Sequence, residues 1–333
     1  MIQPAMPNAT LPADPREVRV VARHALADGI AGFDLQALDG LPLPPFTAGA
    51  HIDVHTPAGA VRPYSLWGAP AEGRYRIAVQ LEAGGRGGSV SMHRDVQEGT
   101  VLRIGQTRNQ FCLDEAAPRS LLLAGGIGIT PLLSMAHRLH ELGAGFALHH
   151  CTRNRASAAF AQALREAPFA SRVRHHHDDE PATALDIDQL LSDAAAGTHL
   201  YVCGPQGFMD AALSAARRLG WDDNRLHQEH FAAPAGTASA DTGGDRAFMV
   251  RLQRSQRLIP VAARQTLVEA LAAHGVLIPV SCEQGLCGTC ETRVLEGDID
   301  HRDVHLSPRE QALNDRLMAC CSRARSACLV LDL

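Results

Sequence analysis

The sequence predicts a multidomain protein with an antiparallel β-barrel, an open doubly wound α/β sheet and a smaller C-terminal domain, in 333 residues. Residues 15–115 contain short alternating segments broken by glycine and proline, which is typical of a small barrel. From 116 to 232, strand patterns alternate with helix patterns, which indicates parallel βαβ units. The small, polar, glycine-rich stretch 233–246 is predicted to be a flexible linker. It is followed by residues 247–333, which contain a cluster of cysteines.

The individual elements follow from the periodicity of the apolar residues. Strands are expected at 18–22 and 75–79 in the barrel, at 121–123, 146–150, 173–176 and 200–203 in the α/β domain, and at 248–252. Helices are expected to open near Ser89 and to span 131–142, 158–166, 187–194, 207–219 and 266–274. Because helices separate the strands of the α/β domain, these strands are expected to run parallel.

Composition restricts the classes of function. Hydrophobic residues make up 46% of the chain and charged residues 20%, so the chain can bury an ample core. A net charge of -5 gives no reason to expect binding to nucleic acid or to an acidic membrane. All 31 basic residues are arginine, which excludes a P-loop lysine and lysine Schiff-base chemistry. The N-terminus lacks signal-peptide features and no apolar run is long enough to span a membrane, so we expect a cytoplasmic protein.

Four cysteines carry the strongest chemical signal. Cys282, Cys287 and Cys290 form a C-x4-C-x2-C run, and Cys320 follows at a distance. This is the spacing of a plant-type [2Fe–2S] centre, in which a short glycine-containing loop wraps three thiolates around the irons. Zinc and disulfides are the alternatives, but structural zinc usually takes two separate close pairs. The remaining cysteines are expected to be buried free thiols: Cys112, Cys151, Cys203, Cys321 and Cys328.

Two segments of the barrel domain together favour a flavin phosphate. Both combine arginine with small or hydroxyl-bearing residues: Arg62-Pro63-Tyr64-Ser65-Leu66 between strands, and Arg86-Gly87-Gly88-Ser89 before a short helix. Glycines open the backbone to a bulky anion, and amides at a helix N-terminus attract phosphate. Ser89 is expected to cap the helix, and the two arginines would add charge-assisted hydrogen bonds. Ordinary barrel structure is the alternative for either segment alone.

Two turns of the α/β domain are expected at one edge of the sheet, because each follows a strand and precedes a helix. Both contain glycine: Gly125-Gly126-Ile127-Gly128-Ile129-Thr130-Pro131 and Cys203-Gly204-Pro205-Gln206. Thr130 is the predicted N-cap of its helix and Pro131 the first helical residue. Nucleotides bind at the carboxyl edge of such sheets, so the turns predict a dinucleotide crevice, although the first turn is not a G-x-G-x-x-G fingerprint. Two ordinary βα loops are the alternative.

Two histidine-rich segments have competing explanations. The run 175–180, His-His-His-Asp-Asp-Glu, looks like a metal tract, but neighbouring side chains on a strand point to opposite faces, which disfavours a metal site. The segment 226–231 ends in Phe231, an aromatic side chain that could cover a flat ring at the exposed end of a domain. Core packing is the alternative for Phe231.

In this order, the motifs resemble those of the phthalate dioxygenase reductase family, which includes the reductase subunits of vanillate demethylases. The resemblance covers nearly the whole chain, up to the closing segment 329–333. It implies a β-grasp ferredoxin fold for residues 247–333, with FMN, NADH and a [2Fe–2S] cluster as cofactors. It also implies a monomeric reductase that passes electrons from NADH through FMN and the cluster to a Rieske-type aromatic oxygenase.

The resemblance assigns roles to residues by their position. Tyr64 would lie against the flavin, Ser65 near its N5 atom, and Phe231 stacked on the isoalloxazine ring. The flavin phosphate would be held by Arg62, Arg86, Gly87, Gly88 and Ser89. The nicotinamide would be surrounded by Gly125, Gly126, Gly128, Thr130, Cys203, Gly204 and Pro205, with Ser65, Cys203 and Thr130 as the catalytic group. The iron ligands would be Cys282, Cys287, Cys290 and Cys320, with Cys321 in a place where the family usually has valine.

Other functions stay open at this point. The chain could be an FAD-containing reductase of a cytochrome P450, or a redox-sensing iron–sulfur flavoprotein, which would show no steady turnover with NADH. The arginines of the segment 151–155, after the second strand of the α/β domain, suggest a 2′-phosphate and hence NADPH. The family resemblance implies NADH instead.

Overall fold

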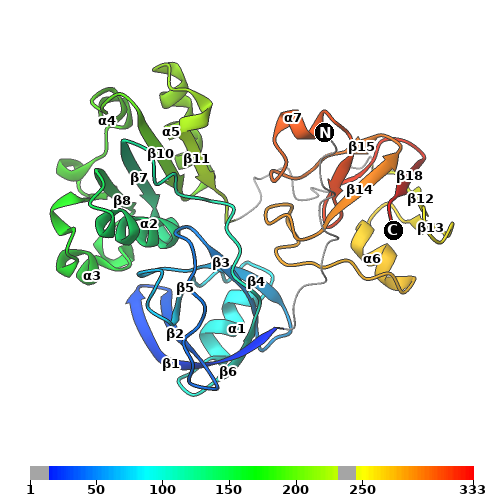
Figure 1. Ribbon diagram of the computed structural model, residues 1–333, viewed down its shortest axis with the longest axis horizontal. Helices are drawn as coiled ribbons and strands as arrows, with labels where there is room; N and C mark the ends of the chain where they lie inside the picture. The colour runs from blue at the N-terminus through cyan, green and yellow to red at the C-terminus, as the bar shows by residue number, and fades with distance from the viewer. Residues whose placement is uncertain (1–14, 232–244) are drawn as a thin grey trace, which may run out of the picture. The chain divides into compact units, whose positions relative to one another are not determined.

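The computed structural model describes residues 15–231 and 245–333, and the chain divides into two compact units, Met1–Glu229 and His230–Leu333 (Figure 1). Most of the predicted linker, 233–246, lies outside the described residues. Its last two residues belong to the second unit. Arg302 donates to both carboxylate oxygens of Asp245, and Arg323 donates to the carbonyl of Arg246. These bonds fix the start of the described part of the second unit.

The first unit begins with an antiparallel sheet. Its strands are β1 (Arg16–Ala27), β2 (Ile30–Ala37), β3 (His51–His55), β4 (Val61–Ser65), β5 (Tyr75–Gln80) and β6 (Val101–Ile104), and helix α1 (Gly88–Asp95) follows β5. The strand order is β4-β3-β6-β1-β2-β5. An antiparallel bridge between Leu66 and Ile77 joins the two edges, so the sheet closes into a barrel. The predicted antiparallel barrel is confirmed.

Side-chain alternation fills the barrel. On β1, Val18 and Val20 are fully buried, whereas Glu17 and Arg19 face solvent. Because successive side chains of a strand lie on opposite faces, an alternating sequence supplies an apolar interior and a polar exterior. The fully buried side chains of the interior include Phe33, Leu35, Ile52, Leu66, Ile77 and Met92.

A parallel sheet forms the rest of the first unit. Its strands are β7 (Arg119–Gly125), β8 (Phe146–Thr152), β9 (Val173–His177), β10 (Thr198–Cys203) and β11 (Leu226–Glu229), in the order β11-β10-β7-β8-β9. The helices are α2 (Ile129–Glu141), α3 (Ala161–Glu166), α4 (Ile187–Ser192) and α5 (Gln206–Arg218), with short 3-10 turns η1 (Gly126–Gly128), η2 (Arg155–Ser157), η3 (Ala170–Arg172), η4 (Pro181–Thr183) and η5 (Asp223–Arg225). Strand β11 was not predicted, since its partly exposed residues show no clear alternation.

The central strand β7 is covered on both faces. Leu122 and Ala124 belong to a core that includes Leu132 of α2, whereas Leu121 and Leu123 belong to a second core with α4 and α5. A parallel strand that is buried on both faces has a nearly continuous apolar sequence rather than an alternating one. The predicted doubly wound sheet is confirmed.

The barrel and the parallel sheet share one hydrophobic core. Ile30, Ala78 and Phe111 from the barrel side lie in the same buried cluster as Leu122 and residues of α2. The cluster also holds Phe160, which packs edge-on against Trp67 with ring centroids 4.8 Å apart. This continuous packing explains why residues up to Glu229 form a single compact unit.

The second unit is a small mixed sheet with its own core. Its strands are β12 (Phe248–Leu252), β13 (Leu258–Val261), β14 (Glu291–Glu296), β16 (Arg316–Met318) and β18 (Cys328–Leu331), in the order β13-β12-β18-β14-β16, together with the pair β15 (Ile299–Asp300) and β17 (Arg323–Ala324). Helix α6 (Leu267–Ala273) begins with a capping box between Thr266 and Glu269, and α7 (Pro308–Gln311) is one short turn. Strand β12 runs parallel to β18 and antiparallel to β13.

Two helix starts differ from the prediction. Helix α1 has Gly87 as its N-cap, and Ser89 lies in the first turn, where its Oγ accepts a hydrogen bond from the amide of Glu82. Helix α2 begins at Ile129 directly after η1, and the Thr130 hydroxyl donates to the Ile127 carbonyl. The predictions of Ser89 and Thr130 as N-caps, and of Pro131 as the first helical residue, are therefore wrong. The preceding glycine turns enter the helix directly and provide the cap themselves.

No helix in the described parts of the chain combines the length and the apolar character that crossing a bilayer requires.

Truncation of Phe160 tests the shared core. Phe160→Ala removes a buried ring from the contact between barrel and parallel sheet, which should lower the stability of the first unit by about 3–5 kcal/mol. Both tryptophans, Trp67 and Trp221, lie in the first unit, so fluorescence melting reports that unit alone. Loss of the visible iron–sulfur absorbance should occur at the wild-type temperature. An unchanged fluorescence midpoint would contradict the shared core.

Candidate functional site

The two predicted phosphate-binding segments lie side by side in the first unit. Arg62 is on β4, and a Cβ atom added to Gly88 at the start of α1 would lie 2.9 Å from Cγ of Arg62. Only a residue without a side chain lets the helix approach the arginine this closely. The first amides of α1 have no partners within the helix, and with the nearby guanidinium they form a donor set that suits a phosphate. Arg86 and Gly87 form the turn that leads into this helix.

The end of β4 carries the other two residues of the predicted flavin motif. Tyr64 packs against the barrel core, and this burial raises the pKa of its hydroxyl to about 12. Ser65, the last residue of β4, is buried. The motif therefore presents a neutral phenol and a buried hydroxyl next to the phosphate-binding turn.

The two glycine turns of the parallel sheet pack backbone against backbone. A Cβ atom on Gly128 would lie 2.3 Å from the carbonyl oxygen of Cys203, and one on Gly204 would lie 2.8 Å from Cα of Gly125. Side chains at either position would push apart the ends of β7 and β10. Pro205, which caps α5, packs over Gly125, so that a Cβ there would lie 2.8 Å from the proline Cδ. The two turns therefore form one continuous surface at the carboxyl edge of the sheet.

Glu229 joins the flavin motif to this surface. It is the last residue of β11 and pairs with Cys203, the last residue of β10, in the parallel register. Its carboxyl group is hydrogen-bonded to the Ser65 side chain at the end of β4. Three strand ends therefore meet at Ser65, Glu229 and Cys203. Glu229 is not among the residues that the sequence predicts for the site, although it lies in the segment 226–231 that also contains Phe231.

The junction is uncharged over much of the pH range. Burial raises the pKa of Glu229 to about 8, against a smaller opposing effect of the Ser65 hydrogen bond. Burial, followed by the negative charge of Glu229, raises the pKa of the Cys203 thiol well above its usual value. Within the described residues, Oε2 of Glu229 meets no hydrogen-bond partner. A buried carboxyl with an unused oxygen next to a protonated thiol is typical of a functional site.

His150 is hydrogen-bonded to the turn at Gly125–Gly128. The side chain is fully buried on β8, and its Nε2 lies 3.2 Å from the carbonyl oxygen of Gly126. Burial lowers the pKa of His150 to about 4, so the ring is neutral and Nε2–H donates to the carbonyl. Sequence reasoning placed His150 on a strand but gave it no role, because a single polar residue in an apolar run carries no specific signal.

The remaining predicted residues of this region have separate positions. Thr130 is buried in the first turn of α2, close in sequence to the glycine turn. Phe231 lies just past the end of β11 in the second unit, with 43% of its side chain exposed. The structure leaves its proposed contact with a flavin as a prediction.

The histidines of β9 are engaged by other side chains and by backbone. His176 contacts Nδ1 of His149 at 2.9 Å and the carbonyl of Thr183 at 2.7 Å, and His177 contacts the Thr152 hydroxyl at 2.8 Å. In the part of the chain that the structure describes, no three His, Cys, Asp or Glu side chains are arranged to hold a single metal ion.

The cysteine loop brings its four predicted ligands together. The Cys282 thiol is in hydrogen-bond contact with those of Cys287 and Cys320, and the Cys320 thiol with that of Cys290. All four residues are buried, with exposed fractions of 3% to 6%. Two of them lie next to strands of the sheet: Cys290 immediately precedes β14, and Cys320 follows the end of β16 by two residues. Four converging thiols are the donor set of a [2Fe–2S] centre.

Backbone amides of the loop point at the sulfurs. The amides of Gln284 and Leu286 each donate to the Cys282 Sγ, and the Cys282 amide donates to the Cys287 Sγ, all at 3.4 Å. Gly285 makes this wrap possible, because its φ is +73° and a Cβ there would lie 2.6 Å from the Cys321 Sγ. Such amide donors stabilise the negative charge of bound thiolates, so the loop fits the cluster.

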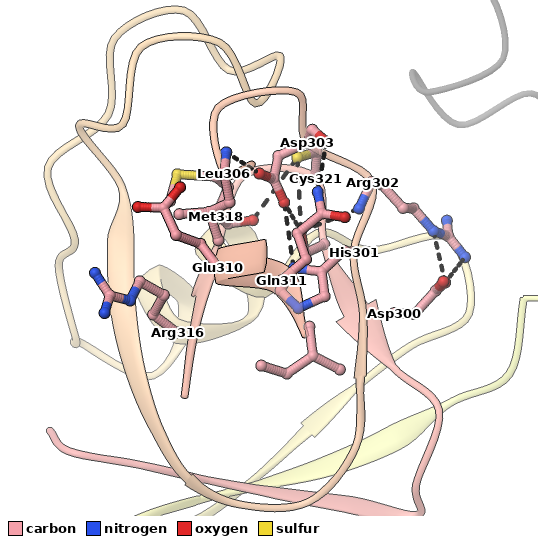
Figure 2. Close-up of polar contacts among 12 residues, drawn as sticks. Asp300, His301, Arg302, Asp303, Leu306, Glu310, Gln311, Arg316, Met318 and Cys321 are labelled. Atoms are coloured by element: carbon pink, nitrogen blue, oxygen red, sulfur yellow. Dashed lines mark hydrogen bonds and ion pairs between the residues drawn. The ribbon is translucent and has the colours of Figure 1, made fainter. Parts of the chain in front are cut away.

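A buried carboxylate, Asp303, secures this loop from the opposite side. Its side chain is fully buried and accepts hydrogen bonds from the Leu306 amide at 2.9 Å and the Ser322 hydroxyl at 3.2 Å. Figure 2 shows His301, Gln311 and Cys321 gathered around it, with His301 Nδ1 3.4 Å from the carboxylate. The next two amides, those of residues 304 and 305, donate to the carbonyl of Gly285. Asp303 and the two amides that follow it therefore connect the turn at Gly285 to the segment that carries Cys320.

Comparisons with known protein families match two parts of the chain. Residues 250–325 match the family described as 2Fe-2S iron-sulfur cluster binding domain. Residues 105–226 match the family described as dimethylamine monooxygenase subunit DmmA-like, N-terminal domain.

Similar proteins cover nearly the full length of the chain. A vanillate O-demethylase oxidoreductase of Pseudomonas sp. strain HR199 is 48% identical over 319 residues, which cover 95% of this chain and 99% of that protein. The solved structure of phthalate dioxygenase reductase, described as modular for electron transfer from pyridine nucleotides to [2Fe-2S], is 38% identical with a TM-score of 0.74, covering 95% of this chain and 97% of that chain. An intact type IV self-sufficient cytochrome P450 monooxygenase is 38% identical with a TM-score of 0.83, covering 96% of this chain and 41% of that chain.

The protonation of Glu229 predicts a pH-dependent stability. Because its pKa in the folded protein is raised to about 8, the stabilisation that the neutral carboxyl provides is complete below its ordinary pKa of 4.5 and is lost as the pH rises to about 8. Glu229→Gln keeps a neutral side chain at all pH values. The free energy of unfolding of the wild type, measured by fluorescence melting, should therefore fall relative to that of the variant across this range, by up to about 1.4 kcal/mol per pH unit. A constant difference between the two proteins would show that Glu229 ionises normally.

Removal of the Asp303 carboxylate should loosen the cluster. Asp303→Ala leaves the buried amide of Leu306 without an acceptor, at a cost of about 1–3 kcal/mol, and releases the Ser322 hydroxyl. Iron should then be lost to a chelator several-fold faster, as followed by visible absorbance, whereas Asp303→Asn, which keeps an oxygen acceptor, should stay closer to the wild type. Asp298→Ala, an exposed acid nearby, serves as the control. Equal iron loss from all four proteins would refute the role of Asp303.

Proposed function

This chain belongs to the phthalate dioxygenase reductase family, and we propose that it is the NADH-dependent reductase component of a Rieske-type aromatic oxygenase. It is an oxidoreductase whose first unit binds the flavin and the pyridine nucleotide, and whose second unit is a [2Fe–2S] ferredoxin domain. The proposed domain boundaries are those of the sequence analysis, with the flavin domain at 15–115, the nucleotide domain at 116–232 and the ferredoxin domain at 247–333.

One observation carries this proposal. The hydrogen bond between Ser65 and Glu229, together with the pairing of Glu229 with Cys203, joins the strand of the flavin motif to a nucleotide-binding turn. A flavin held at the phosphate-binding turn of α1 and a nicotinamide held at the turns after β7 and β10 would both reach this junction. Hydride transfer requires that the two rings be held together with correct orientation.

When bound, the cofactors supply the redox chemistry, in which a hydride from NADH enters and single electrons leave through the [2Fe–2S] centre. The residues of the chain position these groups. Arg62, Arg86 and the first amides of α1 hold the flavin phosphate, and Gly126 and Thr130 border the nicotinamide. Cys203 keeps its thiol proton because burial raises its pKa. Together with the neutral Glu229 and the Ser65 hydroxyl, it provides an uncharged, water-excluding wall.

FMN is the proposed flavin because the donors of the first unit converge on one phosphate. Arg62 and Gly88 lie in direct proximity at the start of α1, and this site accounts for the single phosphate of FMN. The proposal includes a monomer in the cytoplasm. Of the five cysteines outside the predicted ligand set, only Cys203 is buried, whereas Cys112 is exposed and Cys151, Cys321 and Cys328 are partly exposed, so the prediction that all five are buried is wrong.

The partner is proposed from the similar proteins. The vanillate O-demethylase oxidoreductase shares more of its sequence with this chain than the cytochrome P450 monooxygenase does, and it matches the chain over the full length of both proteins. An oxygenase that acts on a methoxylated or otherwise substituted aromatic acid is therefore favoured. The P450 similarity keeps a haem monooxygenase as the second candidate for the electron acceptor.

Loss of the iron ligands should stop electron transfer through the cluster while the flavin is still reduced by NADH. Replacement of Cys282, Cys287, Cys290 or Cys320 by serine removes a thiolate from the cluster, so iron content and visible absorbance should fall. The first unit has its own core, so NADH should still bleach the flavin and ferricyanide reduction should continue. Reduction of cytochrome c and of the oxygenase component should fall to near background.

Cys321→Val is the matched control, because it changes the neighbouring thiol and leaves the proposed ligands in place. This variant should keep its cluster and all four activities. If Cys321→Val destroys the cluster while Cys320→Ser spares it, the ligand assignment is wrong by one residue. If a cluster-free variant reduces the oxygenase at the wild-type rate, the path through the cluster is wrong.

A further inference from the structure

A pair of opposite charges lies at the carboxyl edge of the parallel sheet, next to the proposed nucleotide site. Strands β8 and β9 end side by side, with Thr152 opposite His177. Beyond β8 the chain continues as Arg153-Asn154-Arg155, and beyond β9 as Asp178-Asp179-Glu180. In dinucleotide-binding sheets, the adenosine ribose binds at the carboxyl end of the strand that follows the glycine-rich turn and its helix. In this protein that strand is β8. These residues therefore occupy the position at which NADH and NADPH differ.

Both turns are held rigidly by their own hydrogen bonds. The Asn154 side chain accepts from the Ser157 amide at 2.9 Å and the Ser157 hydroxyl accepts from the Asn154 amide, so that a capping box fixes η2, which begins at Arg155. The Glu180 amide donates to the His177 carbonyl at 3.0 Å, and its carbonyl accepts from the Thr183 amide at 2.8 Å. The two backbones are therefore fixed before any nucleotide binds.

Arg155 and Glu180 form a two-pronged ion pair across these turns. Nη2 of Arg155 donates to Oε2 of Glu180 at 2.6 Å, and Nε donates to Oε1. The arginine side chain is 71% exposed, so the pair contributes little to the stability of the fold. Its effect is instead to occupy the guanidinium edge that could otherwise bind a phosphate in a two-pronged manner.

We propose that Glu180 makes the protein select NADH over NADPH by holding Arg155 and by placing a negative charge where a 2′-phosphate would bind. This inference rests on the proposed function, since it concerns the nucleotide that the first unit uses. A ribose with a free 2′-hydroxyl meets a site whose arginine is already paired. A 2′-phosphate would have to displace Glu180 from Arg155 and would lie next to like charge.

The neighbouring charges act in the same direction. Asp178 and Asp179 follow the end of β9, and the Asp179 amide donates to the Arg153 carbonyl, which keeps the two turns together. Two arginines therefore face three acids at this edge, and the local charge is negative. The arginines of the segment 151–155, taken alone, suggest NADPH. The acidic residues that face them, Asp178 to Glu180, follow the next strand, β9.

The test is the cofactor preference of Glu180→Gln, measured in the full-length holoenzyme with ferricyanide as electron acceptor. The variant frees Arg155, so the ratio of kcat/KM for NADPH to that for NADH should rise about tenfold, the effect of one charge-assisted contact at an exposed site. The change should lie in the KM for NADPH and not in its kcat, because the ribose takes no part in the reaction. Binding of 2′,5′-ADP, as a competitive inhibitor, should tighten in parallel while that of 5′-AMP should not.

Two further variants make the result specific. Arg155→Ala in the Glu180→Gln background should return both the ratio and the affinity for 2′,5′-ADP to the wild-type values. Glu115→Gln is the matched control, because Glu115 forms the same two-pronged pair with Arg138 but precedes β7 at the opposite edge of the sheet. It should leave the ratio unchanged.

The outcomes separate this inference from the proposed function. A wild-type protein that oxidises neither nucleotide, or that prefers NADPH, would refute the proposed NADH-dependent reductase. Normal NADH oxidation with an unchanged ratio in Glu180→Gln would refute only the role of Glu180. A gain that persists after Arg155→Ala would also refute it, because a residue other than Arg155 would then bind the phosphate.

Discussion

The chemistry of the first unit depends on one junction, at which the ends of β4, β10 and β11 meet. The hydrogen bond of Ser65 with Glu229, and the pairing of Glu229 with Cys203, connect the barrel to the parallel sheet. The hydrophobic core that the barrel and the sheet share keeps their relative position fixed. A flavin site and a nucleotide site built on separate sheets can cooperate only if the two sheets cannot move apart, since reacting rings must be held in contact.

In the second unit, local contacts bring four thiols together in a domain that has only a small hydrophobic core. Gly285 lets the loop turn sharply, three amides point at the sulfurs, and Asp303 ties the turn to the segment that carries Cys320. A metal centre stabilises the fold in the same way that a ligand does. The loop and the cluster therefore support each other.

Burial decides what each charged group does in this protein. Glu229 and Asp303 are both buried carboxyls, but Glu229 has one oxygen without a partner in the described structure and a raised pKa, whereas Asp303 is fixed by an amide and a hydroxyl. Glu229 therefore favours the neutral form at the junction of β4, β10 and β11, and Asp303 serves to position a loop. The Arg155–Glu180 pair is exposed, where ion pairs add little stability, and so its influence falls on the ligand and not on the fold.

The sequence by itself determined the barrel, the parallel sheet, the cysteine loop and the family, because periodicity and motif spacing are local properties that a linear pattern records. The spacing of Cys282, Cys287 and Cys290 already predicted a [2Fe–2S] site, in the segment that matches the 2Fe-2S iron-sulfur cluster binding domain. Only the tertiary structure decided that Glu229 contacts Ser65 and Cys203, that Asp303 accepts hydrogen bonds from Leu306 and Ser322, and that Glu180 pairs with Arg155. It also moved the caps of α1 and α2 from Ser89 and Thr130 to the glycines before them, since a glycine turn can enter a helix without a capping side chain. These features depend on contacts between distant segments, and such contacts arise only when the strands are brought side by side.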